Sequence, residues 1–141
     1  MNATTTHRSE TDHRGLPNPY DTPASAATRF AMELAAWSAG PLAVYEATDS
    51  LALAGLSLAV LLAAPALFNT PGDKHKDGPV CTPGPGRLAI EVGLIAVAVG
   101  GAAMVWPTPV AAAVTATAVA AVISGAPRTR WLLQGAPATT R

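Results

Sequence analysis

Apolar residues along the chain are concentrated in four long runs, separated by short polar or turn-forming segments. The runs cover roughly residues 24–47, 51–68, 87–106 and 109–124. At 1.5 Å per residue, the second run makes a helix of ~27 Å, close to the thickness of the hydrocarbon core of a bilayer. A capping hydroxyl followed by proline, at Thr22–Pro23 and Thr108–Pro109, marks the start of the first and fourth runs. The pattern predicts an all-α integral membrane protein, a bundle of four transmembrane helices.

The positive charges fall on one side of this four-span arrangement. Seven of the nine Lys and Arg residues lie before the first run, between the second and third, or after the fourth, and the other two, Arg29 and Arg87, lie at the start of the first and third runs. The other two connections contain none. Cytoplasmic segments of membrane proteins carry an excess of Lys and Arg. We therefore expect both termini in the cytoplasm. The Ala-, Gly- and Pro-rich composition points to a bacterial source, so the expected location is the bacterial plasma membrane, as a multi-pass protein.

Three segments lie outside the transmembrane domain, which is expected over residues 23–126. Residues 1–22 are polar, carry both charge signs and lack periodicity, which predicts a disordered cytoplasmic tail. The prolines and glycines of residues 69–86 predict a turn-rich cytoplasmic loop without regular structure. The fourth helix is expected to end at Ser124, before Pro127. Residues 127–141 are then a cytoplasmic tail whose basic, aromatic start rests at the membrane interface.

A short pattern is repeated at the openings of the first and third runs. The segments RFAMEL (29–34) and RLAIEV (87–92) share the order Arg, apolar, Ala, apolar, Glu, apolar. Each segment begins a helical hairpin, and both hairpins enter the membrane from the same side. The repeat therefore predicts two parallel-oriented hairpins related by a pseudo-twofold axis along the membrane normal.

The charged residues of this repeat are the candidate functional residues: Arg29, Glu33, Arg87 and Glu91. Each glutamate lies one helical turn, ~6 Å, further into the membrane than its arginine. Charged groups in a membrane usually face the bundle interior and have a partner. One interpretation is a structural clamp of two Arg–Glu pairs, formed within each helix or crosswise between the hairpins. The other is a pair of carboxylates that handles protons or cations, because intramembrane carboxylates often serve transport.

Other chemistry has little support in the sequence. The spans contain no nucleophile–histidine set, no metal-ligand set and no phosphate-binding glycine loop, so we expect no catalytic residue, metal or cofactor. The segment from Asp73 to Gly78 is similar to the start of a calcium loop, but the twelfth position is Gly84 instead of Glu, which argues against calcium binding. His75 lies between two carboxylates, and we interpret this segment as a solvated turn in preference to a weak transition-metal site. The net charge of zero and the absence of a basic stripe argue against a nucleic-acid partner.

The same motifs resemble those of a known family. The R-F-x-x-E-L segment at Arg29, the Pro65, Phe68, Pro71 run and the R-L-x-x-E segment at Arg87 are similar to the YrdB-like small bacterial membrane proteins. That family is defined by sequence and has no assigned function. The resemblance covers roughly residues 27–125. It implies that the four repeat residues are the family's signature positions, and it implies no activity.

The expected function is that of a non-enzymatic structural or accessory module in the lipid bilayer, within a homo-oligomer or a larger membrane complex. The alternative is a small proton- or cation-coupled transporter that uses Glu33 and Glu91. The strong charge bias fixes one orientation in the membrane. A transporter would therefore need parallel protomers or the internal repeat itself.

Overall fold

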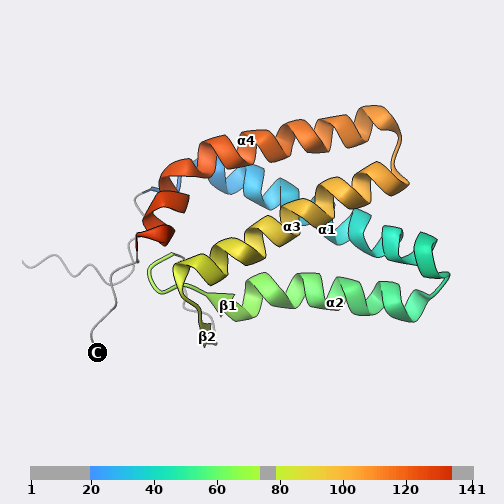
Figure 1. The fold of residues 1–141 in the computed structure, drawn as a ribbon, viewed down its shortest axis with the longest axis horizontal. Helices are drawn as coiled ribbons and strands as arrows, with labels where there is room; N and C mark the ends of the chain where they lie inside the picture. Colours follow the sequence, from blue (N-terminus) through green and yellow to red (C-terminus); the bar gives the residue numbers. More distant parts are fainter. Residues whose placement is uncertain (1–19, 74–78, 135–141) are drawn as a thin grey trace, which may run out of the picture.

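The protein is all-helical, as the apolar runs predict. The computed structural model describes residues 20–73 and 79–134. Its helices are α1 (Pro23–Thr48), α2 (Leu51–Leu67), α3 (Gly84–Val105) and α4 (Thr108–Leu133). Each helix reverses the direction of the one before it, so α1 and α3 begin, and α2 and α4 end, at the same end of the molecule (Figure 1). We call this the arginine end, because Arg29, Arg87, Arg128 and Arg130 all lie in the helical turns near it.

Two of the described helices, α3 and α4, are long and apolar enough to cross a membrane, and α2 is a shorter apolar helix of 17 residues. The start of α1 is the predicted one: Thr22 Oγ1 accepts a hydrogen bond of 3.1 Å from the backbone N–H of Ser25, and Pro23 is the first helical residue. The start of α4 differs from the prediction. Its N-cap is Pro107, and Thr108, expected to cap the helix through its hydroxyl, is already helical.

The predicted end of α4 is wrong, because the helix continues through Pro127 to Leu133. A proline inside a helix removes one backbone hydrogen bond and usually breaks or kinks the helix. Here the turns beyond it are held by burial, since Arg128 is only 2 % exposed and Leu132 is fully buried. The first residues of the expected interfacial tail are therefore packed helix.

The connection between α2 and α3 has more regular structure than expected. Strands β1 (Phe68–Asn69) and β2 (Val80–Cys81) form a short parallel pair, and α3 begins already at Gly84. The Thr70 hydroxyl donates a hydrogen bond of 2.9 Å to the Thr82 carbonyl, which adds a side-chain link beside the strands. The prediction of a loop without regular structure is wrong at both ends of this segment. The centre of the expected calcium-like turn, residues 74–78, lies outside the described residues, as do residues 1–19 of the expected tail.

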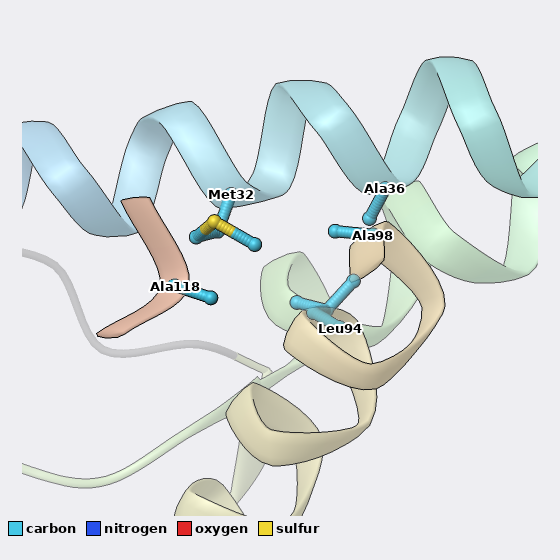
Figure 2. Close-up of a cluster of buried hydrophobic side chains, with 5 residues drawn as sticks. All are labelled: Met32, Ala36, Leu94, Ala98 and Ala118. Carbon is cyan, nitrogen blue, oxygen red and sulfur yellow. The ribbon is translucent and has the colours of Figure 1, made fainter. Parts of the chain in front are cut away.

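Mostly small residues form the centre of the bundle, where α1 and α3 meet and α4 adds one side chain. The buried apolar cluster consists of Met32, Ala36, Leu94, Ala98 and Ala118 (Figure 2). Further along the same two helices, Ala39 and Gly101 are both buried and meet backbone to backbone. Small side chains let helices approach this closely, as is common where helices associate without long apolar side chains between them.

The side chain of Trp37 donates a hydrogen bond to a carbonyl of α2 that has no helical donor. Pro65 has no N–H, so the carbonyl of Leu61, four residues earlier, lacks its helical donor. The indole Nε1–H of Trp37 donates a hydrogen bond of 3.2 Å to that carbonyl. The sequence feature that interrupts α2 is therefore compensated by a side chain of α1.

We expect the substitution Trp37→Phe to lower the free energy of unfolding by about 1 kcal/mol, the value of one buried hydrogen bond. Thermal or denaturant unfolding of the detergent-solubilised protein measures this loss. The variant Pro65→Ala restores the backbone donor to Leu61, so in that background Trp37→Phe should cost clearly less. Equal costs in the two backgrounds would contradict the assigned role of the indole.

Candidate functional site

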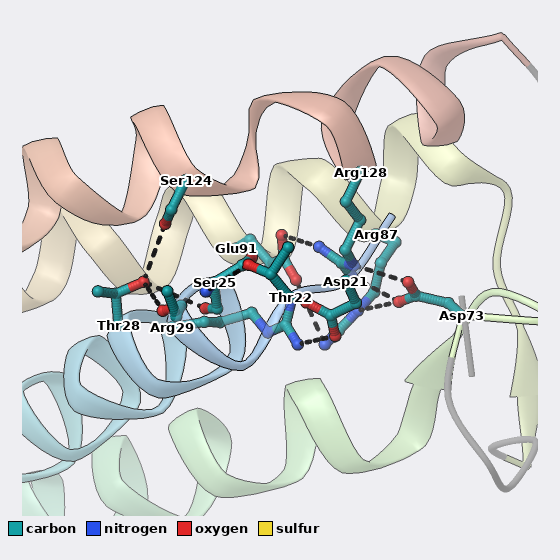
Figure 3. A network of polar contacts seen from close by, with 11 residues as sticks. Asp21, Thr22, Ser25, Thr28, Arg29, Asp73, Arg87, Glu91, Ser124 and Arg128 are labelled. Atoms are coloured by element: carbon teal, nitrogen blue, oxygen red, sulfur yellow. Dashed lines mark hydrogen bonds and ion pairs between the residues drawn. The ribbon is translucent and has the colours of Figure 1, made fainter. Parts of the chain in front are cut away.

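Four charged side chains, three of them buried and one, Glu91, partly buried, form a cluster at the arginine end. They are Asp73, which follows β1, Arg87 and Glu91 on α3, and Arg128 on α4 (Figure 3). The Nε of Arg128 donates to Asp73 Oδ1 at 2.7 Å, and its Nη2 donates to Asp73 Oδ2. Its Nη1 donates to Glu91 Oε2 at 2.8 Å. One guanidinium thus joins the α2–α3 connection, α3 and α4, with the paired geometry that arginine and carboxylate favour.

The second arginine of the cluster, Arg87, is fully buried. Its Nη1 donates to the carbonyl of Phe68 at 3.4 Å. Its Nε lies 3.8 Å from Asp73 Oδ2, and its Nη2 lies 3.6 Å from Glu91 Oε1, so it forms ion pairs with both carboxylates. With two arginines and two acids, the charges of the cluster balance. This balance offsets part of the large cost of removing charged groups from water.

A tight turn brings Asp73 into the cluster. In the segment Thr70-Pro71-Gly72-Asp73, the backbone N–H of Asp73 donates to the carbonyl of Thr70 at 3.1 Å, and Gly72 has a φ of 79°. Proline at the second position and a glycine with positive φ at the third are typical of a type II turn. The turn directs Asp73, which is 4 % exposed, toward the first turn of α3. The expectation that Asp73 lies in a solvated turn is therefore wrong.

The residues of the first repeat, Arg29 and Glu33, are arranged differently. Arg29 forms a forked pair with Asp21, which precedes α1: Nη2 lies 2.7 Å from Oδ2 and Nη1 lies 3.4 Å from Oδ1 (Figure 3). Among the described residues, Glu33 takes part in no ion pair or hydrogen bond. The i, i+4 Arg–Glu pair therefore forms on α3 and not on α1. Neither of the crosswise pairs considered from the sequence occurs in the described part of the chain.

A cavity of about 240 Å³ lies beside the cluster, between α1, α3 and α4. Four charged residues line it: Arg29, Glu33, Glu91 and Arg128. Most of the remaining wall is apolar and comes from all three helices: Met32, Leu88, Leu94, Ile95, Ala121 and Val122. Three of the four residues singled out in the repeat thus meet at one cavity, and the fourth, Arg87, lies behind it in the cluster.

Two residues of the cluster, Asp73 and Arg128, are not among the candidate residues predicted from the sequence. A signal for Asp73 was present in the Thr-Pro-Gly turn, which sets the direction of the chain. For Arg128, a helical period carried through Pro127 would have placed it, together with Leu132, on the same face as Ala121. Because the helix was expected to end before Pro127, the prediction did not extend this face to Arg128.

Within residues 20–73 and 79–134, no three His, Cys, Asp or Glu side chains lie close enough together to hold a metal ion. No known protein family, curated protein or solved structure that was compared with the chain matches it. The resemblance to the YrdB-like proteins therefore stays a prediction.

Proposed function

We propose that the chain is a multi-pass protein of the bacterial plasma membrane, with all four helices crossing the bilayer as two parallel hairpins and both termini in the cytoplasm. The apolar windows of α3 and α4 support this, because only 22 % and 6 % of them is buried within the protein. The core helix of a soluble protein is mostly buried, whereas lipid-facing helices expose apolar side chains. The arginines of the described residues support the orientation, since they share one end of the bundle.

The single cysteine of the chain, Cys81, offers a direct test of this topology. It is exposed and lies in the connection proposed to be cytoplasmic. A membrane-impermeant maleimide added to intact spheroplasts should therefore leave Cys81 unlabelled until the cells are lysed. In a Cys81→Ser background, the variant Thr48→Cys at the other end of α1 should be labelled without lysis. The opposite labelling order would refute the orientation, and labelling of both sites in intact cells would refute the membrane location.

We further propose that the protein is a non-enzymatic structural or accessory module. One observation supports this proposal most directly. The Nε, Nη1 and Nη2 atoms of Arg128 all donate hydrogen bonds to carboxylates of the chain itself. Such a cluster fixes the positions of α3, α4 and the connection before α3. It leaves none of the three guanidinium nitrogens of Arg128 without a carboxylate of the chain as its acceptor. A rigid bundle end of this kind suits a protein whose role is to assemble with itself or with a larger membrane complex.

Purification of the tagged protein in mild detergent, at its native expression level, tests the accessory role. Mass spectrometry should identify one stoichiometric membrane partner, or the protein should elute as a defined homo-oligomer. A monomer without a partner would contradict the proposed module.

A second function, proton- or cation-coupled transport, is supported by one specific observation. Glu33 lines the cavity and forms no ion pair or hydrogen bond with a described residue. An ionisable residue in a membrane span is a functional-site hypothesis by default. Proton flux into liposomes tests it. Flux in the wild type that disappears in the Glu33→Gln, Glu91→Gln double variant would make transport the primary function. Because Glu91 also belongs to the cluster, Glu33→Gln alone is the cleaner variant.

A further inference from the structure

We propose that the cavity between α1, α3 and α4 binds an amphipathic ammonium ion, with the cationic group paired to Glu33 and the apolar group against the helix walls. This ligand site goes beyond the structural role proposed above. It rests on the proposed membrane location, but it does not require that the protein has a partner or transports anything.

The charges around the cavity favour a cation. Arg128 forms hydrogen-bonded ion pairs with Asp73 and Glu91, and Arg29 forms one with Asp21. Glu91 is paired with Arg128 through Oε2 and lies within ion-pair distance of Arg87 through Oε1. Of the charged groups that line the cavity, Glu33 alone forms no ion pair or hydrogen bond with a described residue. A carboxylate in an environment of low polarity is stabilised by an opposite charge.

The walls favour an organic cation over a metal ion. Metal ions of the calcium or magnesium type need several oxygen ligands. Of the two carboxylates in the cavity wall, Glu91 is already paired with Arg128, and Glu33 has mostly aliphatic neighbours such as Met32, Leu94 and Ile95. An apolar cavity of ~150 Å³ is enough to hold benzene, and this one measures about 240 Å³. It therefore has room for an aromatic or short alkyl group together with an ammonium head.

The edge of the cavity reaches the outer surface of the helices. Two of its lining residues, Val92 on α3 and Val122 on α4, are 56 % and 61 % exposed. In the proposed topology this surface faces lipid, and Glu33 lies one turn inside Arg29. An amphiphile dissolved in the bilayer could thus enter sideways and place its ammonium group near the depth of the lipid headgroups, where such groups normally reside.

Binding of fluorobenzyltrimethylammonium to the protein in phosphatidylglycerol nanodiscs, followed by fluorine NMR, tests this site. After subtraction of the signal from empty discs, the wild type should show saturable binding, and Glu33→Gln should weaken it by about tenfold or more, the loss expected for one charge-assisted contact. Glu46→Gln is the matched control, because it makes the same change on the exposed, opposite end of α1 and should leave the affinity unchanged. A neutral isostere, fluoroneopentylbenzene, should not distinguish the wild type from Glu33→Gln.

Two further variants keep the test decisive if Glu33→Gln disturbs folding. Val122→Trp leaves Glu33 in place and puts a large side chain at the edge of the cavity, so it should also weaken binding, whereas Glu33→Asp keeps the charge and should retain most of it. Equal affinity in the wild type, Glu33→Gln and Val122→Trp would overturn the site, as would the absence of saturable binding in correctly reconstituted protein. Failure of the chain to enter nanodiscs would instead overturn the membrane location.

The natural ammonium group could belong to a lipid headgroup or to a soluble amphiphile, and the same measurement separates the two. Nanodiscs in which phosphatidylethanolamine replaces half of the phosphatidylglycerol, each referred to empty discs of the same lipid, supply a competing headgroup amine. Weaker apparent binding of the probe in these discs supports the site and assigns it to a lipid. Unchanged binding supports the site and assigns it to a soluble amphiphile.

Discussion

Replacement of Arg128 by leucine should lower the free energy of unfolding by about 3–5 kcal/mol, because one partner of a buried ion cluster is lost. The side chain of Asp73 is fully buried and receives two hydrogen bonds from this arginine, and Glu91 receives one. Leucine would remove these three hydrogen bonds, and Arg87 could not replace them in place, because its nearest nitrogen atoms lie 3.6 Å from Glu91 and 3.8 Å from Asp73. Unfolding by denaturant or heat in mild detergent measures the loss.

The matched control for this prediction is Arg130→Leu. Arg130 lies two residues further along the same helix and is exposed, so its loss should change stability by no more than about 0.5 kcal/mol. The variant Arg128→Lys should recover only part of the stability, because an ammonium group cannot reproduce the planar fork that faces Asp73. A similar small effect of Arg128→Leu and Arg130→Leu would show that the cluster does not hold this end of the bundle.

The local pattern of the sequence predicts the helices, but it does not predict the charged cluster. The apolar runs place α1 and α2 almost to the residue, because each is flanked by a cap or a turn that depends on neighbouring residues alone. Whether α4 stops at Pro127 depends instead on what the following turns touch. Arg128 contacts Asp73, 55 residues earlier in the chain, and no local pattern contains that contact.

The internal repeat also shows that a local sequence pattern does not determine the contacts of a side chain. Arg29 and Arg87 have similar sequence neighbours, yet Arg87 lies beside Asp73 and Glu91, and Arg29 pairs with Asp21 before its own helix. The first hairpin has no counterpart of Arg128, since α2 carries no charged residue. The two glutamates consequently differ: Glu91 is held by arginines on two helices, whereas Glu33 faces the cavity. The same short motif thus supplies part of a structural cluster in one copy and a candidate binding group in the other.

Glu91 belongs to both features, and this connects the stability of the cluster with the shape of the cavity. Its Oε2 accepts from Arg128, and its side chain forms part of the cavity wall. Loss of Arg128 should therefore loosen the wall on the α3 side as well as weaken the bundle. We expect the core contact between α1 and α3 to be independent of this, because it lies deeper in the bundle and contains no charged residue.

Gly101→Ala should lower the free energy of unfolding by about 1–3 kcal/mol, whereas Gly100→Ala, one residue earlier, should be neutral or stabilising by up to about 1 kcal/mol. A methyl group on Gly101 would lie 2.9 Å from the carbonyl carbon and oxygen of Ala39, so α1 and α3 would have to move apart. A methyl group on Gly100 meets no atom within 4 Å, and alanine favours the helix over glycine. The pair isolates packing from helix propensity, since both glycines lie in α3 and receive the same added atom. Unfolding of the two variants in the same detergent measures the difference, and equal stabilities would mean that the close approach of α1 and α3 does not hold the bundle together.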